Sequence, residues 1–437
     1  MLPIPRRSSP LLAGLAILLA ATACGDASGG GSEARLEAAV DTVEGVERRT
    51  YPAERAARLP WGFDTTAVLG GFGVDDPDYQ FGSVADVGFA ADSEGSLYLL
   101  DPEGIRVLGY APDGSFLGTW GREGGGPGEL GGGFGGGPRA MDMGPGDTLW
   151  ISDRANQRFT LFPVTEPEGQ VVSVPMPQAQ QRLAGKISVD TAGVLGVMSA
   201  FSFGPGEETD GLPSRPLARI GRDGEPGDTL WTFPAPVTDQ VTITSGGNQL
   251  MMMMGQQFSP GSHWVRFSDG VVALADGPEY EIRFLAPDGA GAVEKILRRE
   301  PAPRPTTEAD RQAHLDSMLA PPEEETRFNT AEIRRQRAEA TTFAEVIPRI
   351  VEMRVDTRDR LWVGVSEETP GRIDRIDVYG RDGALLGELR ETPMPSFFYG
   401  DGRAAILDTD ELDVQQLHML RLIDEAEELE SVANAGG

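Results

Sequence analysis

Four aspartates stand at corresponding positions of a repeated sequence unit, and their carboxylates are the side chains of this chain best suited to chemistry. Each comes at the end of a short apolar run: Asp101, Asp153, Asp276 and Asp408. If the repeats stack in register, these side chains lie near one rim. Carboxylate and carbonyl oxygens there would suit Ca²⁺, which takes about six to eight oxygen ligands. The alternative is structural, because aspartates also end strands by accepting hydrogen bonds from nearby backbone amides.

A second candidate site is basic. Arg334, Arg335 and Arg337 fall within residues 331–340, which we expect to form an exposed helix, in a chain whose formal net charge is −30. Such a cluster can bind an acidic partner. The alternative is a solvated helix face paired with the acidic run at residues 323–325.

Composition excludes or disfavours other kinds of site. The single cysteine, Cys24, rules out a disulfide framework and a cysteine-based zinc site within one chain. The three histidines, His263, His314 and His418, are too few and too far apart in sequence for a His-rich metal site. We expect His314 to be solvent-exposed. His263 is either a surface or core residue or, beside Trp264, part of a pocket.

The N-terminal residues indicate export. Arg6 and Arg7 precede an apolar run at residues 11–20, and small residues lead from there to Cys24. This order is typical of a signal peptide at residues 1–23, which is too short to span a membrane. Residues 21–24, Ala-Thr-Ala-Cys, resemble a bacterial lipobox. The resemblance implies a lipid on Cys24 and attachment to the bacterial cell envelope, at the outer membrane or the periplasmic face. The alternative is an ordinary secretory signal.

Residues 24–60 are then expected to hold the lipidated cysteine, a flexible Gly- and Ser-rich tether and a segment along the edge of the folded body.

The remainder of the chain is a β repeat. Six copies of an apolar strand are each followed by a polar turn and a second strand; the first strands are residues 95–101, 147–153, 193–199, 270–276, 359–365 and 403–408. We interpret these six as the inner strands of successive sheets. Asp-Gly pairs at 113–114, 223–224, 288–289 and 382–383 predict two-residue hairpin turns with positive φ. The 57 glycines and 33 prolines also favour a many-turned all-β protein.

Six such units are typical of a β-propeller. The run from Trp120 to Leu130, WGREGGGPGEL, resembles the glycine-rich turn between blades of the NHL-like six-bladed β-propeller family. The resemblance implies an all-β, six-bladed propeller at residues 61–425, with a helical insertion between blades at about 301–342 and an acidic tail at 426–437. Residues 66–73 look like the outer strand of other blades. We expect them to complete the last blade and close the ring.

Two insertions interrupt the repeat. The first, at 239–260, contains four methionines at 251–254, which we interpret as a buried apolar strand. In the second, Thr307 with Asp310 and Asn329 with Glu332 predict the starts of two helices.

Two functions remain open, because propellers serve as binding modules and as enzymes. The main expectation is an exported, lipid-anchored recognition module for a peptide, glycan or protein partner in the cell envelope. We expect it to be monomeric, with the helical insertion over one mouth of the ring. The acidic composition, 68 Asp and Glu against 38 Lys and Arg, disfavours nucleic acid as a partner. The alternative is a lactonase- or lyase-like propeller enzyme with a metal and acidic residues in the central channel, as the similar gluconolactonase-like propellers have.

Overall fold

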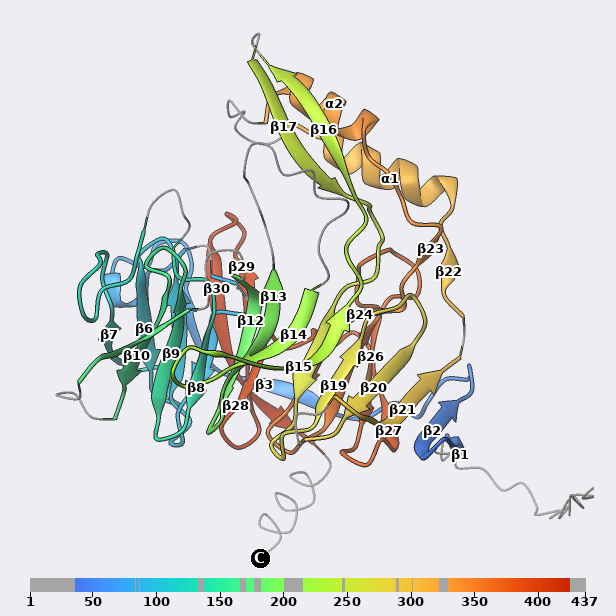
Figure 1. The fold of residues 1–437 in the computed structure, drawn as a ribbon, viewed down its shortest axis with the longest axis horizontal. Coiled ribbons are helices and arrows are strands. Elements are labelled where there is room, and N and C mark those ends of the chain that lie inside the picture. The colour runs from blue at the N-terminus through green and yellow to red at the C-terminus, as the bar shows by residue number, and fades with distance from the viewer. Residues whose placement is uncertain are drawn as a thin grey trace, which may run out of the picture. The chain divides into compact units, whose positions relative to one another are not determined.

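Six antiparallel sheets of four blade strands each form a six-bladed β-propeller, as the repeat predicted (Figure 1). From the inside outward, blade 1 is β4 (Phe89–Ala91), β5 (Leu97–Asp101), β6 (Arg106–Tyr110) and β7 (Phe116–Trp120), and blade 2 is β8 (Met141–Gly144), β9 (Thr148–Asp153), β10 (Arg158–Pro163) and β11 (Val172–Pro175). Blade 3 is β12 (Arg182–Asp190), β13 (Gly193–Ser199), β14 (Arg215–Ile220) and β15 (Pro226–Phe233), and blade 4 is β18 (His263–Arg266), β19 (Val272–Ala275), β20 (Glu281–Leu285) and β21 (Val293–Arg299). Blade 5 is β24 (Ile350–Val355), β25 (Leu361–Val365), β26 (Arg375–Tyr379) and β27 (Leu385–Leu389), and blade 6 is β28 (Phe397–Tyr399), β29 (Arg403–Thr409), β30 (Gln415–Ile423) and β3 (Gly62–Gly70).

This computed structural model describes residues 36–82, 84–85, 87–132, 137–165, 170–176, 182–199, 215–245, 248–287, 291–300, 302–321 and 329–424. All of them belong to one unit, Ala34–Gly437. The predicted signal peptide, Cys24 and the acidic tail lie outside the described residues. Within them, no helix has both the length and the apolar character needed to cross a membrane.

The ring closes through its two ends. β3, from the N-terminal part of the chain, pairs antiparallel with β30, from Gly62 opposite Ile423 to Gly70 opposite Gln416. The expectation that this segment completes the last blade is confirmed. The described residues form an apolar cluster at each of the six interfaces between neighbouring blades, including the interface between blades 6 and 1.

The interpretation of the repeat's first strands as inner strands is wrong. They are the second strands of the blades, and the inner position belongs to β4, β8, β12, β18, β24 and β28, most of which contact the next inner strand around the ring. The second strands are covered by neighbouring blades on both faces, and β5 and β25 are buried at every residue. A continuous apolar run is therefore their signature. Inner strands such as β4 and β28, with three residues each, are too short to produce a pattern.

The Asp-Gly turns also differ from the prediction. Only the glycine has positive φ, +85° at Gly114, +85° at Gly224 and +84° at Gly383. In the first turn, Ala111 N donates to Ser115 O and Gly114 N to Ala111 O, both at 2.8 Å. This is the three-residue loop with a left-handed glycine at its end. In each of these three turns, the carboxylate of the aspartate before the glycine accepts a hydrogen bond from the backbone N–H two residues after that aspartate. The fourth pair, 288–289, lies outside the described residues.

The segment before the first blade runs along the outer edge of the ring. β1 (Ala39–Val43) and β2 (Val46–Tyr51) form a hairpin, and β2 pairs in parallel with β21, so blade 4 gains two strands. Farther on, Leu59 N donates to Glu388 O of blade 5 at 2.9 Å. The segment therefore connects the outer strands of two blades.

The two insertions form one module, which we call the cap (residues 238–258 and 304–347). It contains the hairpin β16 (Thr238–Ser245) and β17 (Asn248–Gly255), the helices α1 (Glu308–Leu319) and α2 (Ala331–Glu339), and the strand pair β22 (Arg304–Pro305) and β23 (Val346–Ile347). Gln336 of α2 joins the helix to the hairpin. Its side chain accepts a hydrogen bond from Thr244 N of β16 at 2.8 Å and donates one to Thr244 O at 2.9 Å. Residues Gln257 and Phe343 form a parallel bridge.

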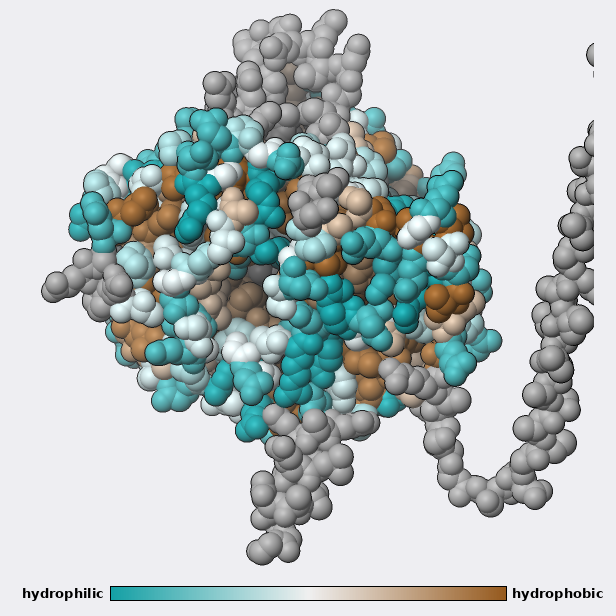
Figure 2. Space-filling view, turned by 60° about the horizontal axis from the view of Figure 1, so that its bottom comes forward, coloured by the Kyte–Doolittle hydropathy of each residue, from teal (hydrophilic) through white to brown (hydrophobic). Residues whose placement is uncertain are grey.

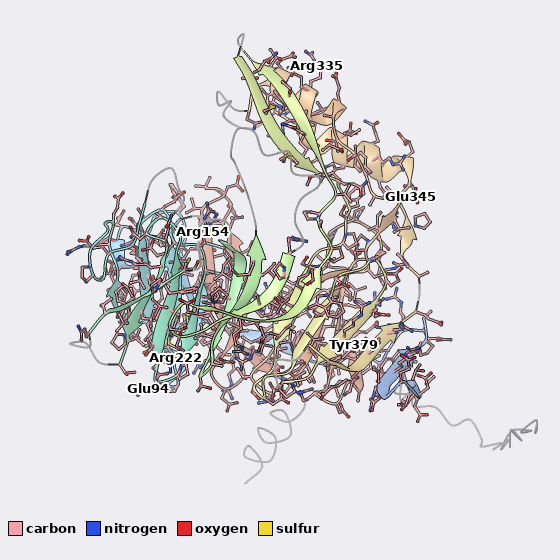
Figure 3. The ribbon with its side chains drawn as sticks, in the orientation of Figure 1. Glu94, Arg154, Arg222, Arg335, Glu345 and Tyr379 are labelled. Atoms are coloured by element: carbon pink, nitrogen blue, oxygen red, sulfur yellow. The ribbon has the colours of Figure 1, made fainter. Side chains whose placement is uncertain are left out.

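Both insertions leave the propeller from the same face. Each is a crossing from an outer strand to the next inner strand, and in an antiparallel blade this crossing starts at the face that also carries the turn between the second and third strands. Figure 3 agrees: Arg154, in the turn after β9, lies toward the cap, whereas Arg222, in the turn after β14, lies toward the other face.

Helix α1 begins as predicted, with a capping box between Thr307 and Asp310. The N-cap residue of the second helix, α2, is Thr330 and not Asn329. The Thr330 hydroxyl accepts from Ile333 N at 3.3 Å, whereas Asn329 uses its carbonyl to accept from the Arg334 guanidinium at 2.7 Å.

Two expectations about the cap are wrong. The methionine strand is not buried, since Met251 is 66% and Met253 46% exposed, because the hairpin leaves one face to solvent. His314 is not solvent-exposed but half-buried, with its ring 5.6 Å from that of Phe258 and 5.7 Å from that of Phe343.

Ring closure predicts a stability difference between adjacent residues of β3. Leu69 is 4% exposed and belongs to the cluster between blades 6 and 1, whereas Val68 is 48% exposed. We expect Leu69→Ala to lower the free energy of unfolding by about 2–4 kcal/mol, since it leaves a cavity at the closing interface. The matched Val68→Ala change should stay within about 0.5 kcal/mol. Urea denaturation measures both, and equal effects would contradict this account of closure.

Candidate functional site

The six inner strands enclose a cavity at the centre of the ring. This channel pocket, of about 200 Å³, takes side chains from every blade, among them Phe89, Asp142, Lys186, Arg266, Arg354 and Phe397. A second cavity of about 360 Å³, the mouth pocket, shares Val87, Lys186 and Arg354 with it. The mouth pocket includes His263, the first residue of β18, so it lies toward the face from which the cap leaves.

The lining of the two pockets is basic, in contrast to the whole chain. Four basic residues, Lys186, Arg215, Arg266 and Arg354, face two acidic residues, Asp142 and Glu352. They come from β8, β12, β14, β18 and β24, in blades 2 to 5, so only the closed ring brings them together. Such a concave cationic surface attracts small anions.

Acidic and carbonyl groups hold two of the arginines in place. Arg354 pairs with Glu352 on the same strand, and its Nε donates to Ser396 O at 3.0 Å. Arg266 Nη2 lies 2.8 Å from Asp190 Oδ2, while its buried Nε has no hydrogen-bond partner in the described part of the chain. A buried donor without a partner is costly, so Arg266 is held mainly by its pairing with Asp190.

Lys186 differs from these arginines. Its Nζ lies 5.4 Å from the centre of the Trp264 ring, and among the described residues it makes no hydrogen bond or ion pair. Burial in the channel wall, together with the positive charge of Arg354, lowers the pKa of Lys186 to about 8. Part of the lysine population is therefore a neutral amine near neutral pH.

Two further groups of the lining titrate at unusual pH. Burial raises the pKa of Asp142 to about 6, although its Oδ2 accepts a hydrogen bond from Val189 N at 2.7 Å. Burial lowers the pKa of His263 to about 4, so this imidazole is neutral at pH 7. His263 thus lines a pocket, the second of the two possibilities that the sequence left open. Asp142 and Lys186 together place a proton acceptor and a proton donor around neutral pH.

The four aspartates predicted as metal ligands are not brought together. Asp101 lies 3.1 Å from Arg106, Asp153 accepts from Gly131 N at 3.0 Å, and Asp276 lies 2.6 Å from Arg283. Asp408 is exposed on β29 and accepts from the neighbouring Thr409 amide. Across the described ranges no group of three or more His, Cys, Asp or Glu side chains could hold a metal ion. Three of the four aspartates pair with arginines or accept from amides of nearby strands and turns, and Asp408 accepts from the next residue; such contacts belong to aspartates that stabilise strand ends.

The predicted basic cluster does not form one binding face. Arg334 is buried, Arg337 is half-buried, and Arg335 is exposed but pairs with Glu332 on the same helix. Figure 3 shows Arg335 at the end of the cap distant from Tyr379 in blade 5.

The sequence analysis did not identify the channel residues, because they lie on inner strands, which produce no clear apolar run or alternation in the sequence. One signal was present: Lys186 is one of only two lysines in the chain, the other being Lys295.

No family model and no curated protein matches the sequence. Similar solved structures include the virginiamycin B lyase of Staphylococcus aureus (11% identity, 83% of this chain and 100% of that chain covered, TM-score 0.39). Others are a protein described as a putative gluconolactonase (14%, 85% and 99%, TM-score 0.37) and the PQQ-bound aldose sugar dehydrogenase of Streptomyces coelicolor (12%, 84% and 100%, TM-score 0.39). All three are named as enzymes. Similarity this distant does not extend to the ligand or reaction of the present chain.

The raised pKa of Asp142 predicts a pH-dependent stability difference. Burial disfavours its ionised form, so the protein loses stability relative to a neutral replacement as the pH rises from about 4, where unfolded aspartate ionises, through about 6. We expect the stability of Asp142→Asn relative to the wild type to increase over that range in urea denaturation.

The control is Asp113→Asn. Asp113 is exposed, and hydrogen bonds from Ser115 lower its pKa. The stability of Asp113→Asn relative to the wild type should not increase with rising pH. Parallel curves for Asp142→Asn and the wild type would contradict the pKa assignment.

Proposed function

We propose that this propeller is an enzyme that binds a small anionic molecule in its central channel and acts on it by proton transfer. The observation that carries the proposal is the convergence of Lys186, Arg266 and Arg354, from blades 3, 4 and 5, on one cavity of a protein with a net charge of −30. Burying these cations costs free energy, and an anionic ligand recovers part of that cost.

The size and polarity of the site favour a small carboxylate or phosphate. The channel pocket of about 200 Å³ holds a molecule of a few heavy atoms, and its apolar wall, which includes Phe89 and Phe397, limits competing water. Glu352 and Asp190 pair with the two arginines, so their guanidinium groups keep a fixed orientation in the lining.

Asp142 and Lys186 supply the chemistry. Their pKa values of about 6 and 8 place them on either side of neutral pH, where general acid and base catalysis is most efficient. This proposal keeps the enzyme alternative and assigns proton transfer to a carboxyl–amine pair.

We further propose that the chain is exported, lipid-anchored through Cys24 and related to NHL-like propellers. The lipobox-like residues 21–24 support the anchor. The glycine-rich run that ends at Leu130 supports the relationship, since it lies between β7 and β8, where one blade passes to the next.

Recognition of an envelope peptide, glycan or protein is a second candidate, favoured by the exposed Met251 and Met253 on the cap. A partner bound there would not depend on Lys186 or Arg354, which separates the two functions.

Anion binding is tested by substitution in the channel. We expect Lys186→Met and Arg354→Met each to weaken the binding of pyruvate or inorganic phosphate about 10- to 100-fold, because a hydrogen bond to a charged group contributes about 1.5–3 kcal/mol. Isothermal titration calorimetry measures the affinities. Arg335→Met, which removes an arginine from the cap, should bind like the wild type. Loss of affinity in all three variants, or in none, would refute the channel as the site.

The anchor is tested by Cys24→Ser in the full chain expressed in a bacterium. We expect the wild type in the membrane fraction with a lipid-modified N-terminus, and the variant without lipid and released from the membrane. The tether variant Ser28→Ala should behave like the wild type. A Cys24→Ser protein that stays on the membrane would rule out lipid anchoring at this residue.

A further inference from the structure

We propose that Lys186 forms an imine with the carbonyl carbon of a small oxo acid, so that the channel takes an aldehyde or ketone that bears a carboxylate. This rests on the proposed function, because it assigns a covalent step to the same channel.

The surroundings of Lys186 suit a nucleophile better than a structural cation. Its Nζ stands over the Trp264 ring at 5.4 Å and has no hydrogen bond or ion pair among the described residues. It lines both pockets, so a molecule entering at the mouth meets it on the way to the channel. Lys295 also lies over an aromatic ring, with its Nζ 5.5 Å from the centre of Phe284, but its Nζ donates a hydrogen bond to Asp382 O at 2.6 Å.

The arginines account for the carboxylate of the substrate. Arg354 lines both pockets with Lys186, and Arg266 lines the channel pocket with it. A carboxylate bound by these guanidinium groups leaves a neighbouring carbonyl carbon beside the lysine. A simple acid without a carbonyl group would bind but could not react.

The charges around Lys186 favour the neutral amine that attacks. Burial is the main cause of its lowered pKa, and Arg354 of β24 acts in the same direction. Asp142 of β8 and Glu352 of β24 oppose this shift, and Glu352 is itself neutralised by its pairing with Arg354. His263 of β18 is neutral at pH 7 and adds no charge. Burial beside another cation is a recognised way to activate a lysine.

The reaction balances without a further reagent. The neutral amine attacks the carbonyl carbon and forms the C–N bond as the C=O π bond breaks, and one proton passes from the nitrogen to the oxygen to give a carbinolamine. A second proton, supplied by the carboxyl group of Asp142, lets the hydroxyl leave as water, and the nitrogen lone pair forms the C=N bond of the iminium. Loss of the proton on nitrogen to Asp142 leaves the neutral imine. One carbonyl and one amine thus give one imine and one water.

The test is reductive trapping. The full chain is incubated with glyoxylate or pyruvate and cyanoborohydride at neutral pH, and the labelled lysine is identified by peptide mapping. We expect Lys186 to be modified at least about 10-fold faster than Lys295, which is the internal control. Lys186→Arg keeps the positive charge but lacks the nucleophilic amine, so it should lose the adduct. Asp142→Asn should slow the trapping.

The outcomes separate the two proposals. If calorimetry shows Lys186-dependent binding of both oxo acids but no adduct forms, or if both lysines react at the same rate, the imine is refuted and anion binding stands. If neither oxo acid nor phosphate binds and none is trapped, both proposals fail. Glycolate, which has no carbonyl carbon besides its carboxylate, should slow the trapping by competition.

Discussion

The pairing of β3 with β30 is the interaction on which the rest of the structure depends. It joins residues 62–70 to residues 415–423 and supplies blade 6 with its outer strand. A ring of sheets has no loose edge at its seam only when such a pairing is made. With the seam closed, the apolar clusters between blades run all the way around, and the inner strands are held against one another. The channel pocket is a consequence of this closure, since it takes side chains from all six blades.

A buried ionic network fixes the two blades that carry the arginines of the channel. Arg299, at the end of β21 in blade 4, pairs with Asp377 of blade 5, and Arg375 Nε donates to the same carboxylate at 2.9 Å. All three side chains are buried. Tyr280 and Tyr379 join the same two blades through a hydroxyl pair at 2.9 Å. Buried charges add little net stability but penalise other packings. The network therefore holds blades 4 and 5 in one relative position, with Arg266 and Arg354 on a common wall.

The channel lining differs in charge from the chain as a whole. The chain has a net charge of −30, and the face in Figure 2 is largely covered by hydrophilic residues, with apolar side chains in smaller groups. The lining of the channel instead has more basic than acidic residues. A negative net charge repels anions on approach, so the proposed binding of a small anion depends on the fixed cations within the cavity. Lys186 and Asp142, whose pKa values are shifted toward neutrality, both line this cavity.

The sequence by itself determined the repeat, the six blades, the closing strand and the capping box of the first helix. These follow from local rules: apolar runs on strands covered on both faces, turn residues between them, and a hydroxyl three residues before an acid. It did not determine the site. The aspartates at strand ends looked like ligands, yet they bond to arginines and amides nearby, because strand pairing puts those groups next to them. Lys186, Asp142 and Arg354 lie on three inner strands with weak patterns, far apart in the chain. Only ring closure brings them together, and only burial in the closed channel moves the pKa values of Lys186 and Asp142 toward neutrality.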